Sequence, residues 1–311
     1  MAQYFDYGEF LRQYFDVKVQ KIAIDAGFMC PNRDGTKGVG GCIYCNNQSF
    51  NPAYCQTRIS VTEQVERGKT FFARKYPQMK YLAYFQAYTN TYGNLEHLIS
   101  LYEEALACND VVGLIIATRP DCMPDELLEY LSGLAKQKFV MVEYGVETSH
   151  DRTLKAINRG HSWADVVDAV SRTARYGVMC GAHLILGLPG ETLEDFIVTA
   201  QRISQLPLST VKLHQLQVIR GTTLAQMYER GEVELMQWSA EEYIDVCLQV
   251  MQHIRRDMAI ERFVSQSPGE LLMSPRWGLK NYEFTHLLLK RMAAQGVEQG
   301  AMVKPKSGIR P

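Results

Sequence analysis

Short apolar runs alternate with amphipathic stretches along the first two thirds of the chain, and this alternation restricts the fold more than any other feature of the sequence. The runs recur roughly every thirty residues, with helix-length segments between them. Strands that are separated in this way pair in parallel through right-handed crossovers. We expect strands at residues 21–26, 81–88, 111–118, 139–147, 178–186 and 210–219. We expect helices between them at residues 61–75, 95–107, 125–137, 162–176 and 192–205.

Six strand–helix units predict an α/β protein built on a partial (β/α)6 TIM-like barrel. The number of units is too small for a closed barrel, which has eight. In barrels of this kind the chemistry lies at the C-terminal ends of the strands. The loops that follow the strands are therefore the places where we expect functional residues.

The pattern changes after residue 221 and predicts a smaller α/β extension at the C-terminus. Its expected elements are a helix at 240–256, a strand at 261–266 and a helix at 281–295. The last residues, KPKSGIRP, are expected to form a frayed basic tail. The expected units are an N-terminal extension (1–20), the barrel (21–220) and the C-terminal extension (221–311).

Composition and charge exclude several classes of protein. The apolar runs are far too short for a membrane span, and the N-terminus lacks the basic and apolar blocks of a secretory signal. There are 33 Lys and Arg residues against 34 Asp and Glu, so the net charge of -1 does not indicate a general polyanion binder. Eight cysteines in such a chain are expected to be reduced thiols, and we predict a cytoplasmic protein without a membrane partner.

Three cysteines form a C-x11-C-x2-C pattern on the loop after the first predicted strand: Cys30, Cys42 and Cys45. Three thiolates without an equally close fourth ligand suit a [4Fe-4S] cluster in which the fourth iron stays open. A structural zinc site is the alternative, and it would need a fourth ligand such as Cys55. Unliganded thiols are the third interpretation, and the spacing alone leaves all three open.

The segment DAGFMCPNRDGTKGVGGCIYC resembles radical S-adenosylmethionine (SAM) enzymes, and most closely their YhcC-type bacterial subfamily. The commonest signature of these enzymes is C-x3-C-x2-C, from which this chain departs by its eleven-residue spacing. More distantly, the chain is similar to the catalytic subunit of Elongator and to oxygen-independent coproporphyrinogen oxidase. The similarity runs from about residue 5 to residue 285. It implies a [4Fe-4S] cluster on Cys30, Cys42 and Cys45, with SAM as the second cofactor.

The resemblance also implies SAM contacts at the ends of the first three strands. Tyr44 lies between two cluster cysteines, where an aromatic ring packs against adenine; loop packing is the alternative. Gln86 and Asn90 follow the second strand, where related enzymes bind the methionine amino group. Their alternative role is to cap the next helix. Thr118 begins the run Thr118-Arg119-Pro120-Asp121 at the end of the third strand, which matches Elongator-like proteins. It is expected to line the cofactor pocket or to form a structural turn.

Later strand ends supply three more expected SAM contacts. Glu147 matches a residue that touches the SAM ribose, because a carboxylate accepts hydrogen bonds from vicinal hydroxyls. Arg159, twelve residues later, would hold the SAM carboxylate; a surface cation is the alternative. His183 stands where the oxidase has an aspartate, and its alternative is a histidine satisfied inside the barrel.

Lys212 and His214 are the expected catalytic residues. They lie two positions apart on the sixth predicted strand, so their side chains point to the same face. A parallel strand covered by helices rarely has a solvated face, which favours the barrel interior and a substrate cavity.

The activity implied by the resemblance is reductive cleavage of SAM, followed by abstraction of a hydrogen atom from a substrate. This requires a one-electron donor such as flavodoxin or ferredoxin. The Elongator-like features imply a tRNA substrate, and basic residues such as Arg220 and Lys280 concentrate toward the C-terminus. A small metabolite or a protein side chain is the competing substrate. A zinc-stapled binding scaffold is the non-enzymatic alternative.

Overall fold

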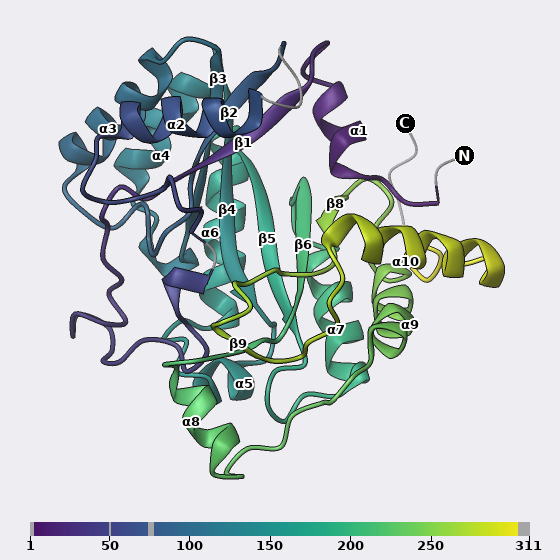
Figure 1. The fold of residues 1–311 in the computed structure, drawn as a ribbon. Coiled ribbons are helices and arrows are strands. Elements are labelled where there is room, and N and C mark those ends of the chain that lie inside the picture. The colour runs from purple at the N-terminus through teal and green to yellow at the C-terminus, as the bar shows by residue number, and fades with distance from the viewer. Residues whose placement is uncertain (1–2, 50, 74–77, 304–311) are drawn as a thin grey trace.

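Seven strands form one parallel sheet, whose order β1-β2-β3-β4-β5-β6-β8 follows the chain. The computed structural model describes residues 3–49, 51–73 and 78–303, and Figure 1 shows this sheet with helices on its outer side. The predicted α/β fold with a partial TIM-like barrel is confirmed. The strands are β1 (Val19–Ile24), β2 (Lys80–Phe85), β3 (Val111–Thr118), β4 (Phe139–Glu147), β5 (Met179–Leu186), β6 (Thr210–Gln215) and β8 (Ala259–Arg262).

Helices cover the outer face of the sheet, and the main core lies between the two layers. Capping defines where the helices begin: the Ser162 hydroxyl accepts from the Asp165 amide at 3.3 Å, and the Asp165 carboxylate accepts from the Ser162 amide at 2.7 Å. The helices are α1 (Tyr7–Arg12), α2 (Val61–Ala73), α3 (Leu95–Ala107), α4 (Asp125–Ala135), α5 (Asp151–Ala156), α6 (Trp163–Arg175), α7 (Leu193–Ile203), α8 (Thr223–Glu229), α9 (Ala240–Met251) and α10 (Asn281–Gln295).

Two expected strands are shorter than the apolar pattern indicates. The strand expected at 81–88 ends at Phe85, and Tyr88 has a left-handed φ of 60°, outside the extended conformation of a regular strand. The strand expected at 210–219 is divided into β6 and β7 (Val218–Ile219). The second piece leaves the barrel and pairs in antiparallel fashion with β9 (Leu272–Ser274).

The seventh barrel strand, β8, comes from the part of the chain where we expected a separate extension. It begins two residues earlier than predicted and pairs in parallel with β6, so it continues the barrel sheet. Its sequence, Ala-Ile-Glu-Arg, is half charged, and the lumen that it faces is polar; the usual run of apolar residues is therefore missing. The terminal tail predicted at 304–311 and the last two residues of the helix predicted at 61–75 lie outside the described residues.

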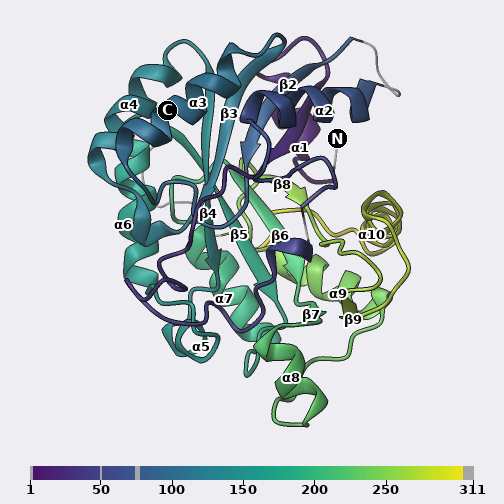
Figure 2. The same ribbon diagram turned by 60° about the vertical axis from the view of Figure 1, so that its left-hand side comes forward.

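Helix α1 packs against the N-terminal end of the barrel. Its Phe10 is buried and contacts Tyr14 and Phe139 in an aromatic cluster, together with apolar lumen residues from β2, β3 and β4. Just before the helix, the Phe5 carbonyl accepts a hydrogen bond from the Ile260 amide at 2.9 Å. The first residues therefore cover the edge of β8 as well as the barrel end (Figure 2).

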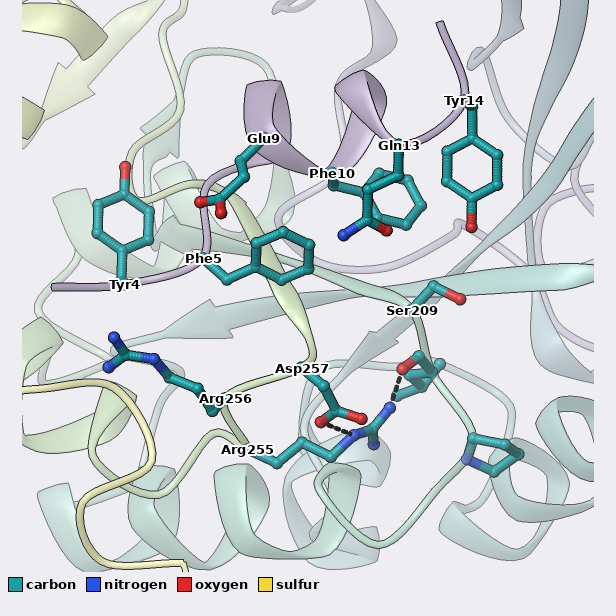
Figure 3. A pocket seen from close by; sticks show the side chains of 12 residues that line it. Tyr4, Phe5, Glu9, Phe10, Gln13, Tyr14, Ser209, Arg255, Arg256 and Asp257 are labelled. Atoms are coloured by element: carbon teal, nitrogen blue, oxygen red, sulfur yellow. Dashed lines mark hydrogen bonds and ion pairs between the residues drawn. The ribbon is translucent and has the colours of Figure 1, made fainter. Parts of the chain in front are cut away.

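A surface pocket of about 870 Å³ lies beside α1, between Phe5, Phe10 and Tyr14 on one side and the 255–257 turn on the other (Figure 3). The turn precedes β8, so the pocket is at the N-terminal end of the strands, opposite the cysteine loop. Arg255, which lines this pocket, forms an ion pair with Asp257 at 2.8 Å and donates hydrogen bonds to backbone carbonyls. None of the helices within the described ranges is both long and apolar enough to cross a membrane.

Replacing Phe10 by alanine tests whether α1 seals the barrel. The ring is only 3% exposed, so its removal leaves a cavity and should lower the free energy of unfolding by about 3–5 kcal/mol. Urea denaturation measures this, with Tyr282→Ala on α10 as the control, because Tyr282 is 66% exposed and should change stability by less than about 0.5 kcal/mol. Equal effects of the two substitutions would contradict the packing described for α1.

Candidate functional site

The three cysteines lie together on the loop that follows β1, at the C-terminal end of the strands. Cys30 and Cys42 are buried and Cys45 is half-buried. The Cys45 amide donates to the Cys42 carbonyl at 3.0 Å, so the C-x2-C segment is a tight turn. Burial, followed by the neighbouring Cys42, raises the pKa of the Cys45 thiol. Arg33 donates to the Cys45 carbonyl at 2.9 Å and closes the loop on itself.

The cysteine loop is fastened to the segment after α5. Asn158 has a left-handed φ of 53°, which directs its side-chain amide to the carbonyls of Val39 and Gly41 at 3.1 and 2.8 Å. The Ile43 amide donates to the Ile157 carbonyl at 3.1 Å. A long loop that is rich in glycine thus acquires a fixed conformation from a distant part of the chain.

Arg159 links the cysteine loop to the end of β4. Its guanidinium donates to the Gly145 carbonyl at 2.7 Å, lies 3.3 Å from the Glu147 carboxylate and reaches the Cys42 sulfur at 3.6 Å. Glu147 has φ 65° at a bulge in the pairing of β4 with β5, and bulges of this kind redirect side chains. A Cβ on Gly145 would stand 2.5 Å from Arg159, so only glycine leaves room for the guanidinium. The structure therefore brings Glu147 and Arg159 together beside Cys42.

A second buried arginine supports the first. Arg119 donates to the Arg159 carbonyl at 2.7 Å and forms a two-pronged pair with Asp121, with both N–O distances at 2.9 Å. Lys37 of the cysteine loop contacts the same carboxylate at 2.8 Å. Burial would raise the pKa of Asp121, but Arg119 and Lys37 lower it to about 2. His161, buried between the two arginines, has its pKa lowered to about 2 by burial and by their charges, so it is neutral.

The residues expected at the ends of the second and third strands make hydrogen bonds within the protein. The Asn90 amide donates to the Ala117 carbonyl at 2.8 Å, and its side-chain oxygen is buried without a partner. The Thr118 hydroxyl is 2.6 Å from that of Thr91. Gln86 is half-buried, and its backbone N–H donates to the Ile24 carbonyl at 3.3 Å. Asn90 thus has a side-chain oxygen that could accept one further hydrogen bond.

Tyr44 is half-buried and packs against two small apolar groups of residues near the mouth, around Leu154 and around Leu224. Burial and then the charge of Cys42 raise the pKa of its hydroxyl well above the usual value, so it stays protonated. The packing matches the loop-packing alternative, and it also fixes the ring next to the cysteines.

Two lysines and two glutamates form a closed square of ion pairs inside the barrel. Glu143 of β4 lies 2.8 Å from Lys21 of β1 and 2.5 Å from Lys212 of β6. Glu261 of β8 pairs with the same two lysines, at 2.5 and 3.2 Å. Burial would raise the pKa of Glu143, but both lysines and His183 hold it well below the ordinary value. Burial lowers the pKa of Lys212 to about 8, although both glutamates act in the opposite direction.

His183 and His214 lie on the same side of this square, with ring centres 5.4 Å apart. His183 Nε2 is 2.9 Å from Glu143, and because that carboxylate is ionised, Nε2 carries the proton. His214 contacts the Ser265 hydroxyl and lies 3.3 Å from Arg262. Burial lowers the pKa of both imidazoles, so both are neutral. Lys212 is only 3% exposed and fully paired, whereas the histidines are half-buried and remain accessible from the lumen.

Three buried or half-buried cysteines, one of them in contact with a guanidinium group, fit a [4Fe-4S] cluster. Within residues 3–49, 51–73 and 78–303, no three His, Cys, Asp or Glu side chains come together as a site for one metal ion. Each cysteine of a cubane binds a different iron, so cluster ligands stand further apart than the ligands of one ion. Cys55 lies instead near Asp25, and burial followed by that carboxylate raises the pKa of its thiol to about 12. Three thiolates beside buried guanidinium groups match an anionic cluster.

A parallel partial barrel with a cysteine-rich first loop has the architecture of an enzyme whose site lies at the C-terminal mouth. The profile of the radical SAM superfamily matches residues 32–203, and that of the radical SAM C-terminal domain matches residues 208–294. The chain belongs to the radical SAM superfamily and is a radical SAM enzyme. A [4Fe-4S] cluster and SAM are characteristic of this family.

The chain is also similar to individual members. Protein YhcC of Escherichia coli is 34% identical over 299 residues, which cover 96% of this chain and 94% of that protein, so the predicted resemblance is confirmed. A tRNA uridine(34) acetyltransferase of Methanocaldococcus infernus is 29% identical, over 80% of this chain but only 48% of its own length. The solved structure of archaeal Elp3 from the same organism shares the fold, with a TM-score of 0.68 at 19% identity, covering 91% of this chain and 64% of that one.

Several residues of the site were not identified from the sequence. Glu143, Lys21 and Glu261 each lie within or beside an apolar run, and only their alternation with buried neighbours marks them as lumen residues. Asn32 and His161 stand on loops without a recognisable pattern. Both residues are buried, Asn32 against Cys42 and His161 near Arg119 and Arg159, which only the tertiary structure reveals.

Asp121 should stabilise the fold in a pH-dependent way. Its pKa in the folded protein, about 2, lies below the ordinary value of 3.8, so the stabilisation is complete above pH 4 and is lost as the pH falls toward 2. Asp121→Asn should therefore lower the free energy of unfolding by about 2–4 kcal/mol at pH 7, and the difference should shrink below pH 4. Urea denaturation at several pH values measures it. The control is Asp168→Asn, where the carboxylate is 62% exposed. A difference that does not vary with pH would contradict this role of Asp121.

Proposed function

We propose that this protein binds a [4Fe-4S] cluster on Cys30, Cys42 and Cys45, cleaves SAM reductively, and abstracts a hydrogen atom from a substrate. The placement of these three cysteines beside Arg159, at the mouth of a radical SAM barrel, carries the proposal. When bound, the cluster and SAM supply methionine and a 5′-deoxyadenosyl radical. An external one-electron donor such as flavodoxin or ferredoxin supplies the electron.

The residues around Cys42 then bind and orient SAM. Arg159 lies next to the cysteines and offers a charged fork for the SAM carboxylate. Glu147, 3.3 Å from Arg159, is placed to accept from the ribose hydroxyls. Tyr44 offers its ring to the adenine. At the ends of β2 and β3, Asn90 offers its free oxygen to the amino group, while Gln86 and Thr118 line the same side.

The lumen side of the site serves the substrate. His183 and His214 are neutral and present nitrogen atoms toward the lumen, so they suit hydrogen bonding to a polar substrate group. Lys212 acts on the substrate only indirectly, because its ammonium group is engaged by Glu143, Glu261 and the Tyr84 hydroxyl. Helix α1 packs Phe10 against the N-terminal end of the barrel and keeps bulk water out of that end.

We propose a tRNA as the substrate. The support is the similarity to a protein whose name gives tRNA uridine(34) as its target, although the chain spans about half of that relative. The basic residues of the C-terminal part support tRNA binding less than expected. Three of their arginines make hydrogen bonds within the protein: Arg255, Arg262 and Arg276. Arg220 is exposed and lies at the mouth, where its carbonyl accepts from Asn46 of the cysteine loop at 3.1 Å.

Removing any cluster cysteine should abolish both iron binding and SAM cleavage. Cys30→Ala, Cys42→Ala and Cys45→Ala are reconstituted anaerobically, reduced with dithionite, and assayed for iron, for the EPR signal and for 5′-deoxyadenosine. The circular dichroism spectra should stay unchanged. Cys108→Ala and Cys55→Ala are the controls and should retain activity. A wild-type protein that holds one zinc ion and loses it in Cys55→Ala would favour the binding scaffold instead.

Binding to unmodified tRNA should weaken with salt. Neutralised phosphates release counterions, so affinity measured by filter binding should fall by an order of magnitude or more between about 50 and 200 mM salt. Arg220→Glu should weaken binding roughly tenfold, and Lys290→Glu, on the exposed side of α10, should not. No binding at the lowest salt would contradict the tRNA proposal and favour a small metabolite or a protein side chain.

A further inference from the structure

Two side chains donate N–H groups to the sulfur of Cys42. Arg159 Nη1 is 3.6 Å away and Asn32 Nδ2 is 3.8 Å away, both within the range of hydrogen bonds to sulfur. All three residues are buried, so water does not compete for these contacts. Hydrogen bonds to the sulfur ligands are among the factors that set the reduction potential of an iron–sulfur cluster.

Asn32 is held in place from several directions. Its side-chain Nδ2 atom also donates to the Asn158 backbone carbonyl at 2.5 Å. The backbone carbonyl of Asn32 accepts from the Gly41 backbone amide at 2.8 Å. A Cβ on Gly38 would stand 2.2 Å from its side-chain oxygen, and one on Gly160 would stand 3.0 Å away. The side chain is 1% exposed.

The orientation of the Asn32 amide is determined by its neighbours. Its oxygen is buried without a hydrogen-bond partner, which costs free energy. Turning the amide over would place that oxygen against the Asn158 carbonyl and the Cys42 sulfur, both of which are acceptors. The present orientation, with the NH2 group toward the sulfur, is therefore the favourable one. In this orientation the Asn32 oxygen has no partner, and the side-chain N–H group donates to the Cys42 sulfur.

We propose that Asn32 is a positioning residue that raises the reduction potential of the cluster through its N–H contact with Cys42. The proposal rests on the cluster of the proposed function. An added electron increases the negative charge on the sulfur ligands, so an N–H dipole aimed at one of them favours the reduced form. Arg159 acts in the same direction, but it carries a charge and is also the proposed partner of SAM. Asn32 is neutral, so its effect on the potential can be measured separately.

The test is an EPR-monitored redox titration of the reconstituted protein without SAM. Asn32→Ala should keep four irons and shift the one-electron equilibrium toward the oxidised form by roughly three- to tenfold, where tenfold corresponds to 59 mV. Asn32→Asp has nearly the same shape and replaces the donor by a carboxylate. It should shift the equilibrium further in the same direction.

Asn158→Gly is the matched control. Glycine accepts the left-handed φ of this position, and the substitution removes the side-chain contacts to Val39 and Gly41 but keeps the carbonyl that Asn32 uses. It should loosen the loop and shift the potential by much less than Asn32→Ala does, because the N–H contact with Cys42 is kept. An unchanged potential in Asn32→Ala or Asn32→Asp, or an equal shift in Asn158→Gly, would overturn the proposal.

Two further outcomes are distinguishable. If both Asn32 variants fold but bind no iron, Asn32 is needed for assembly, and its assignment to the potential is wrong. If the wild-type protein itself forms no [4Fe-4S] cluster, the proposed function fails first. Iron analysis and circular dichroism of each sample separate these outcomes from a change of potential.

Discussion

A buried charge cannot remain unpaired, and the square of Lys21, Glu143, Lys212 and Glu261 meets this constraint by joining four strands of the barrel. Its corners lie on β1, β4, β6 and β8, so the square links the two edge strands of the sheet across the lumen. Removing one member would leave a buried charge without one of its partners. The Lys21–Glu261 pair therefore joins the two edge strands directly, and the square lies between the apolar lumen residues packed against α1 and the half-buried histidines.

The mouth is organised by a second set of contacts, which runs through arginine and asparagine side chains. Asn158 fastens the cysteine loop, Arg159 joins Cys42 to Glu147, and Arg119 holds the carbonyl of Arg159. These contacts come from the ends of β3 and β4 and from the segment after α5. Loops from different strands thus depend on one another, and the site is rigid although the loops carry many glycines. This is the arrangement that parallel barrels use to build a site from short segments.

The periodic parts of the fold were predictable, and the parts determined by tertiary contacts were not. Long apolar runs such as residues 111–118 predicted their strands correctly, because burial on both faces leaves a clear signal. β8 was predicted only in part, as a strand at 261–266 outside the barrel, because its charged residues face a polar lumen. The spacing of the cysteines predicted the site loop, and the resemblance predicted Glu147 and Arg159, which the structure brings together beside Cys42. Asn32 and Glu143 became recognisable only through partners that lie more than a hundred residues away in the sequence, Asn158 and Lys21.

The pairing of Phe5 with Ile260 has a consequence beyond the barrel itself. An uncovered edge strand is a template on which a second chain can add its own strand, and natural proteins protect such edges. Here Phe5 and Asp6 protect the edge of β8, although they precede this strand by some 250 residues in the sequence. During synthesis the shield is present before the edge that it covers. The order of the elements along the chain therefore lets β8 acquire a covered edge as soon as it joins the sheet.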